Sequence, residues 1–203
     1  MSCGLSATRT FTVPGEGPVD AALMFVGEAP GRSEDLSGAP FMGQSGKVLD
    51  RCLAMVGMAR GEVFITSVLK CRPPKNRNPH AAEVVACRPH LASQLKIIAP
   101  AVVCTLGNAA ATAILGPHPG ISKIHGHARV VDIDGVDICV FPLHHPAATL
   151  YSRPLLQVLE DDFRHLAKFV ARLRAVDDPA ARRDVVMEFT GPAAQCELGR
   201  GAA

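Results

Sequence analysis

Three short apolar runs divide the first half of the chain. Residues 23–26 form the first run, which ends at Gly27, and residues 63–69 and 101–106 form two more that are rich in β-branched side chains. Runs of this length, bounded by glycine or polar residues, are typical of strands that are buried on both faces. We therefore predict three buried strands.

Helical patterns fill the segments between and after these runs. We predict helices over residues 44–57, 81–98 and 108–115, and an apolar stripe over residues 155–173 predicts a long closing helix. Pro89 is expected to break or kink the second of these helices, because proline lacks the amide hydrogen that a helix interior needs.

A hairpin and the alternation of elements indicate the fold class. Residues 129–133 and 136–143 flank an Asp-Gly pair, which is typical of a tight turn between two strands. Strands that alternate with helices predict a three-layer α/β/α sandwich with a mostly parallel central four-stranded sheet. We expect one domain over residues 1–175 and a loosely ordered tail over residues 176–203, where the periodicity fades.

Composition excludes several classes of protein. The net charge is only +2, so a surface that binds nucleic acid would have to be a local patch. Seven cysteines, an odd number, do not indicate a secreted disulfide scaffold. We find neither a secretory leader nor an apolar run of ~20 residues, so we expect a cytoplasmic monomer that does not interact with membranes.

The spacing of three cysteines indicates a metal or cluster site. Cys71 and Cys87 flank a basic, proline-rich loop at residues 72–79, and Cys3 lies near the start of the chain. Thiols placed beside arginines and prolines indicate ligands of a metal or cluster rather than residues of the hydrophobic core. The other cysteines that lie in apolar patterns are interpreted as core residues: Cys52, Cys104 and Cys139.

Three loops that follow predicted strands are expected to meet. They are residues 27–31, 67–79 and 144–147. In open α/β sheets, sites form beyond the carboxyl ends of the strands, so these loops should gather at one edge.

Taken together, these loops resemble the uracil-DNA glycosylase superfamily, and in particular its iron–sulfur branch, family 4. The resemblance covers roughly residues 3–170. The matching motifs are Gly27-Glu28-Ala29-Pro30-Gly31 with Glu34-Asp35, Pro40-Phe41 with Gly43, Gly46 and Leu49, Ile65-Thr66 through Pro79, Cys87, and His145-Pro146-Ala147.

The resemblance implies two catalytic residues. Glu28 would orient or deprotonate water, or stabilise a developing oxocarbenium sugar. His145 would act as a neutral imidazole that donates to the uracil 2-oxo group. The alternatives are a surface or capping glutamate and a structural histidine. Only one of His144 and His145 should face the pocket, and the His-Pro-Ala motif favours His145.

The resemblance also implies a uracil pocket. Phe41 would stack on the base, the alternative being an ordinary core phenylalanine. The turn that contains Gly27, Ala29 and Gly31 would contact uracil or phosphate. Ser67 occupies the place where many family members carry asparagine, which leaves open how strictly uracil is distinguished from cytosine.

DNA contacts are expected on both sides of this pocket. Arg72, Lys75 and Arg77 would meet the phosphate backbone. Leu150 would enter the minor groove as a wedge that fills the vacated stack. Arg153 would contact phosphate, with a solvated arginine as the alternative.

The family's 4Fe–4S cluster takes four thiolates, of which three have candidates here. Cys3, Cys71 and Cys87 match the family positions, and the remaining cysteine would fall just before Met1. Either the chain starts upstream or the cluster has three protein thiolates, and zinc is the alternative metal. We expect the cluster to be structural and to hold the loop at residues 72–79.

The leading hypothesis is a hydrolase that excises uracil from DNA in base-excision repair, with uracil-containing DNA as its partner. A non-catalytic damage binder of the same fold is a second hypothesis. A covalent capture enzyme is disfavoured, because Cys71 follows Lys70 without the basic insert of that branch. An iron–sulfur RNA-binding or electron-transfer module would not explain Glu28, Phe41 and His145 together.

Overall fold

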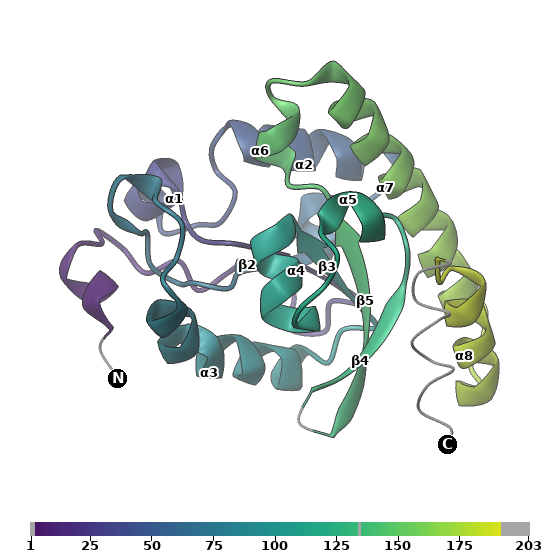
Figure 1. Cartoon of the computed structure of the whole chain (residues 1–203). Coiled ribbons are helices and arrows are strands. Elements are labelled where there is room, and N and C mark those ends of the chain that lie inside the picture. The colour runs from purple at the N-terminus through teal and green to yellow at the C-terminus, as the bar shows by residue number, and fades with distance from the viewer. Residues whose placement is uncertain (1–2, 134, 192–203) are drawn as a thin grey trace.

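A five-stranded sheet forms the centre of the computed structural model, which describes residues 3–133 and 135–191 (Figure 1). The strand order is β2-β1-β3-β5-β4, and every pair is parallel except β4 with β5. The strands are β1 (Leu23–Gly27), β2 (Phe64–Ser67), β3 (Val102–Leu106), β4 (Arg129–Ile133) and β5 (Val136–Leu143). The predicted mostly parallel α/β sheet is confirmed. The count of four was one too few, because both arms of the hairpin join the sheet.

Helices cover both faces of this sheet. They are α1 (Arg32–Ser37), α2 (Gln44–Met55), α3 (Ala81–Ile98), α4 (Asn108–Leu115), α5 (Ile121–Ile124), α6 (Pro146–Thr149), α7 (Arg153–Arg174) and α8 (Pro179–Glu188). Three short 3-10 helices complete the order: η1 (Gly4–Ala7), η2 (Arg60–Glu62) and η3 (Pro74–Asn76).

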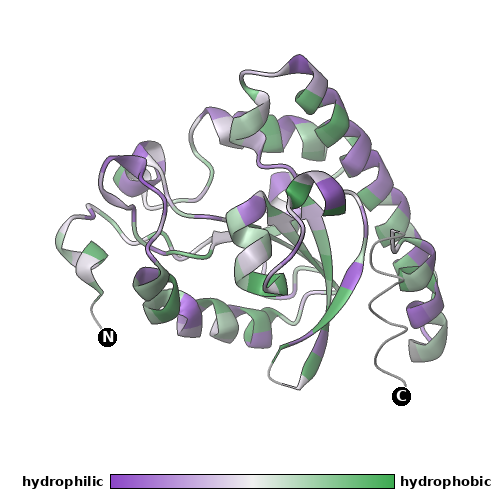
Figure 2. Ribbon diagram, in the orientation of Figure 1, coloured by the Kyte–Doolittle hydropathy of each residue, from purple (hydrophilic) through white to green (hydrophobic). Residues whose placement is uncertain are grey.

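The pleat of β1 divides the core into two layers. Phe25 packs on one face with residues of α2, α7 and α8, whereas Met24 and Val26 pack on the other face with residues of α3 and α4. Successive strand residues point to opposite faces, so a strand between two helical layers must be apolar at every position. Figure 2 shows the hydrophobic strands enclosed between helices with polar outer faces.

Helix α3 continues through Pro89, so the expected break is absent. A proline inside a helix removes one backbone hydrogen bond. Here the helix is held by its apolar residues, because Leu91, Leu95 and Ile98 are buried against the sheet. Ser93 Oγ also donates to the Pro89 carbonyl oxygen at 2.9 Å.

Helix α8 lies in the segment that was expected to be loosely ordered. The Asp178 side chain caps it by accepting from the Ala181 N–H at 2.9 Å. Val185 and Val186 are buried in the same core cluster as α7. This part of the expected tail is therefore helical and packed, while residues 192–203 lie outside the described residues. Over the described part of the chain, no helix combines the length and apolar character needed to cross a membrane.

Candidate functional site

The three loops meet around one cavity at the carboxyl ends of the strands. The cavity has a volume of about 390 Å³. Its lining includes most of the residues that the sequence indicated, namely Glu28, Ala29, Gly31, Phe41, Ser67, Arg77 and His145. It also includes Asn76, which the sequence analysis did not single out. The expected gathering of residues 27–31, 67–79 and 144–147 at one edge is thus observed.

Phe41 forms one wall of this cavity under backbone strain. Its φ angle is +51°, which is uncommon for a residue with a side chain. The ring lies against Gly27, where an added Cβ would come within 2.8 Å of ring atoms Cε2 and Cζ. The Phe41 and His145 rings are stacked with centroids 5.8 Å apart. Phe41 is therefore both a packed residue and a pocket residue, and Gly27 supports it from behind.

Two charged side chains hold the Phe41 loop in place. Glu34 Oε1 accepts from the N–H groups of Met42 and Gly43 at 2.8 and 2.9 Å, and Oε2 accepts from the Gly31 N–H at 3.0 Å. Arg60 Nη2 donates to the Pro40 carbonyl oxygen at 2.6 Å. Glu34 therefore joins the loop after β1 to the loop that carries Phe41.

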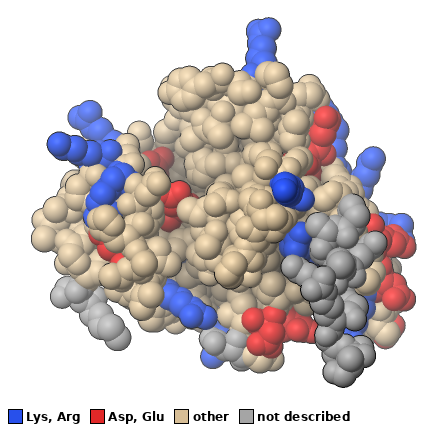
Figure 3. Space-filling view, in the orientation of Figure 1, with Lys and Arg blue, Asp and Glu red and all other residues tan. Residues whose placement is uncertain are grey.

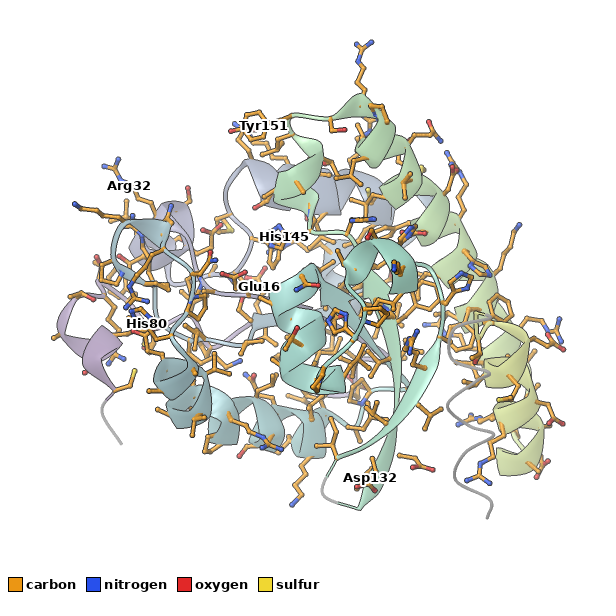
Figure 4. The ribbon with its side chains drawn as sticks, in the orientation of Figure 1. Glu16, Arg32, His80, Asp132, His145 and Tyr151 are labelled. Carbon is orange, nitrogen blue, oxygen red and sulfur yellow. The ribbon has the colours of Figure 1, made fainter. Side chains whose placement is uncertain are left out.

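His145 is neutral, and the position of its proton follows from its hydrogen bonding. The Ala147 N–H donates to His145 Nδ1 at 3.0 Å, so Nδ1 is an acceptor. The proton of the neutral ring must then be on Nε2, which makes Nε2 a donor. Burial lowers the pKa of His145 to about 4. The ring is thus a neutral donor at the cavity (Figure 4).

His144 faces away from this site. It is buried, and its ring centroid lies 4.5 Å from that of His125. His125 Nδ1 in turn pairs with the Asp162 carboxylate at 2.8 Å. The choice of His145 over His144 as the histidine that lines the cavity is supported by this arrangement.

Glu28 lines the cavity from the end of β1. Burial raises the pKa of its carboxyl group above the ordinary value. The main chain is fixed on both sides, because Val68 N–H donates to the Gly27 oxygen and Leu69 N–H donates to the Glu28 oxygen. A partly desolvated carboxylate on a fixed turn suits a general base.

Lys70, which the sequence analysis did not single out, lies directly behind Ser67. Its Nζ donates to Thr66 Oγ1 at 2.6 Å, to the Ser67 carbonyl oxygen at 2.7 Å and to Gln94 Oε1 at 2.6 Å. Burial lowers the pKa of this ammonium group to about 8. A buried lysine bonded only to neutral acceptors leaves no pattern in the sequence that distinguishes it from a surface lysine.

The basic loop after β2 has only part of its charge available. Arg77 pairs with both oxygens of Glu83 at 2.9 and 2.6 Å, which holds the pKa of Glu83 near 2. Arg72 Nε donates to Asn76 Oδ1 at 2.7 Å. Lys75 is exposed and has a φ angle of +56°. Lys75 is therefore a more available phosphate contact than Arg77.

The other side of the cavity carries Leu150 and Arg153. Leu150 is 42% exposed after α6, and Arg153 is exposed at the first position of α7. In Figure 3, basic side chains gather on the lobe that contains α1, and the surface is hollowed between this lobe and α6. Arg32, exposed at the start of α1, belongs to the basic side and was not singled out from the sequence (Figure 4).

Cys3, Cys71 and Cys87 line a second, smaller cavity of about 180 Å³. Arg9 Nη1 donates to Cys71 Sγ at 3.0 Å, and the Lys70 N–H donates to Cys87 Sγ at 3.3 Å. Cys71 and Cys87 thus each accept a hydrogen bond at sulfur, which suits thiolates that act as ligands.

The three cysteines do not form a preformed metal site. Within residues 3–133 and 135–191, no group of three His, Cys, Asp or Glu side chains is arranged to hold a metal ion. This finding supports neither zinc nor a cluster, and the identity of the metal stays a prediction. Cys52 and Cys104 are fully buried, and burial raises the pKa of the Cys52 thiol to about 11, as expected for inert core cysteines.

The fold and the cavity together define an α/β enzyme whose site lies beyond the strand ends. A family model, the uracil DNA glycosylase superfamily, matches residues 14–174. The chain is 44% identical over 169 residues to a type-4 uracil-DNA glycosylase of Saccharolobus solfataricus, which covers 81% of this chain and 78% of the relative. It is 42% identical over 174 residues to a protein of that name from Archaeoglobus fulgidus, and this match covers 84% of this chain and 87% of the relative. The chain therefore belongs to the uracil-DNA glycosylase superfamily.

Proposed function

We propose that this protein is a uracil-DNA glycosylase of base-excision repair, which hydrolyses the bond between uracil and deoxyribose. The observation that carries the proposal is that the side chains of His145 and Glu28 line the same cavity. His145 presents a neutral Nε2–H donor there, and Glu28 is a carboxylate held partly out of water. Hydrolysis of this bond needs one group that stabilises a leaving anion and one that handles water.

The chemistry follows from these two residues. As the C1′–N1 bond breaks, its electron pair stays on uracil, and His145 Nε2–H stabilises the negative charge at the 2-oxo group. Glu28 orients the water whose oxygen bonds to C1′, and it accepts the proton that this water loses. That proton later restores neutral uracil, and an abasic sugar remains in the DNA.

The cavity would hold the flipped base between Phe41 and the strand ends. One base–aromatic stack contributes roughly 1–3 kcal/mol, which offsets part of the cost of extruding the base. The backbone groups of Ala29 and Gly31 would border the base, and the Ser67 hydroxyl and the Asn76 amide line the same cavity and can bond to its edge. A hydroxyl offers fewer bonds than an amide, so discrimination against cytosine would depend on both side chains together with the shape of the cavity.

Phosphates would be held on both sides of the cavity. Lys75 and Arg72 lie on the loop after β2, with Arg77 ordered by Glu83, and Arg153 lies beyond α6. Leu150 projects from the end of α6 and suits the wedge that enters the vacated stack.

A 4Fe–4S cluster on Cys3, Cys71 and Cys87 would serve as a structural clamp. Cys71 begins the basic loop and Cys87 lies on α3, so a shared cluster would fix the loop against the helix. Arg9 and the Lys70 amide would donate to its sulfur ligands. The bound cluster supplies cross-linking, and uracil hydrolysis needs no electron transfer.

An excision assay tests this function. The protein is incubated with uracil-containing single- and double-stranded oligonucleotides, and abasic sites are then cleaved with alkali. Glu28→Gln and His145→Ala should each lower the single-turnover rate by roughly 10²–10³-fold while changing the DNA Kd little. The matched control is Glu62→Gln, because Glu62 is an exposed carboxylate outside the cavity.

The outcomes separate the competing functions. No alkali-labile product at stoichiometric enzyme would refute the glycosylase and leave the damage-binding alternative. A protein–DNA band that survives denaturation would instead indicate covalent capture. If neither substitution slows excision, the roles given to Glu28 and His145 are wrong.

A further inference from the structure

A single exposed aromatic ring lies next to the expected wedge. Tyr151 is 93% exposed, against 42% for its neighbour Leu150. It is the one tyrosine of the sequence, which contains no tryptophan. An isolated exposed apolar residue needs no explanation by itself, so the argument depends on how this ring is held and where it lies.

The main chain around Tyr151 is fixed rather than free. Thr149 Oγ1 donates to the Pro146 carbonyl oxygen at 2.8 Å, and the Ser152 N–H donates to the Thr149 oxygen at 3.1 Å. Ser152 then caps α7 by accepting from the Leu155 N–H at 3.4 Å. The ring is thus presented by a turn whose two flanking helices are both anchored, which lowers the entropy lost on binding.

The turn is continuous with the uracil cavity. His145, which lines the cavity, is the N-cap of α6, and Tyr151 follows that helix within two residues of its end. Figure 4 shows Tyr151 at the α6–α7 turn, above His145 in this view, with Arg32 to the left on α1. The exposed Arg153 lies two residues further on and can hold a phosphate of the same strand.

We propose that Tyr151 is a stacking platform for the base that flanks uracil in single-stranded DNA. An exposed ring can stack only on a base whose face is open. In a duplex the neighbours cover both faces of each base, and the face that uracil uncovers when it flips out is filled by the Leu150 wedge. Single-stranded DNA exposes these faces, and aromatic stacking with nearby basic residues is a general way to bind it. This inference rests on the proposed function and deepens it, because it assigns single-stranded DNA as the substrate that Tyr151 favours.

The composition of the chain makes a direct test possible. Because Tyr151 is the only tyrosine and tryptophan is absent, the tyrosine fluorescence of the protein reports this ring alone. The full chain is titrated with a thymine-containing single-stranded oligonucleotide that it cannot cleave, and with the matching duplex. N-acetyltyrosinamide mixed with the same DNA corrects for absorption. Stacking should quench the fluorescence with the single strand, and less with the duplex.

Variants separate stacking from mere proximity. Tyr151→Ala should raise the Kd for a uracil-containing single strand by roughly 5- to 150-fold, the effect of one base–aromatic stack, and raise the duplex Kd much less. Tyr151→Phe should keep the affinity, because stacking uses the face of the aromatic ring and not the hydroxyl group. Ile97→Ala, at an exposed apolar residue of α3, is the matched control and should change neither Kd.

Three results would overturn the inference. They are single-strand binding without quenching, an unchanged single-strand Kd for Tyr151→Ala, and a loss that is confined to the duplex. Failure of the proposed function is distinguishable, because quenching and the effect of Tyr151→Ala on Kd would persist while no uracil is released from either substrate.

Discussion

Lys70 Nζ donates a hydrogen bond to the Ser67 carbonyl oxygen at 2.7 Å, and this bond links the cavity lined by Ser67 to the cavity lined by the cysteines and Lys70. The backbone N–H of the same lysine donates to Cys87 Sγ, at the cysteine site. Ser67 ends β2 at the candidate uracil cavity. Lys70 is therefore the residue through which the cysteine site supports the pocket.

Replacing this lysine should weaken the fold. Lys70→Met keeps the aliphatic stem but removes the Nζ donor to the Ser67 carbonyl oxygen and one of the donors to Gln94 Oε1, which Thr66 Oγ1 also contacts. Each unsatisfied buried acceptor costs about 1–3 kcal/mol, so urea unfolding should show a clear loss of stability. The same substitution at the exposed Lys96 should change the unfolding free energy by less than about 0.5 kcal/mol. Equal effects at both positions would contradict the structural role of Lys70.

The pH profile of uracil excision should follow the protonation of the Glu28 carboxyl group. Burial raises the pKa of Glu28, so the carboxyl keeps its proton to a higher pH than an exposed glutamate, and activity should fall as pH decreases through a value above 4.5. His145 becomes charged only near pH 4, below this limb. In Glu28→Gln, the single-turnover rate should no longer show this fall in activity as the pH decreases. A limb that persists unchanged in that variant would assign it to another group.

A methyl group at Gly27 should displace the Phe41 ring. Gly27→Ala would place Cβ 2.8 Å from two ring atoms and 3.3 Å from Ser67 Oγ. Overpacking of this kind costs about 1–3 kcal/mol, and the shifted ring should lower kcat/KM for uracil excision by at least about 10-fold. Gly61→Ala is the control, because no atom lies within 4 Å of its added Cβ. Wild-type kinetics in Gly27→Ala would show that the position of Phe41 is not critical.

Removing the donor to Cys71 should make the proposed cluster labile. Arg9 Nη1 lies 3.0 Å from Cys71 Sγ, and a hydrogen bond to a thiolate stabilises it as a ligand. In Arg9→Ala, the cluster absorbance near ~400 nm should decay several-fold faster in air than in the wild type. In the control Arg88→Ala, a substitution at an exposed arginine, this absorbance should decay at the wild-type rate. Equal decay in all three proteins would exclude a role for Arg9 at the sulfur.

Local pattern was enough to predict the central elements. Strands enclosed between two helical layers are buried at every position and therefore mostly apolar, which is why β1, β2 and β3 were evident as runs. The helix over residues 108–115 was predicted with its observed bounds. Edge and peripheral elements were predicted less well. The first hairpin arm, the edge strand β4, was left out of the strand count. Helix α8 has only a weak apolar pattern because it buries little more than Val185 and Val186.

The sequence by itself determined the order of the buried strands, the loops that follow them and the residue types at the candidate site, because these depend on the local alternation of apolar and polar positions. Only the tertiary structure decided which side chains are partners. It separated His145 from His144, paired Arg77 with Glu83 and placed Lys70 behind Ser67. It also left Tyr151 in solvent beside the cavity. Hydrogen bonding and burial depend on atoms that are distant in the chain, so no local pattern records them.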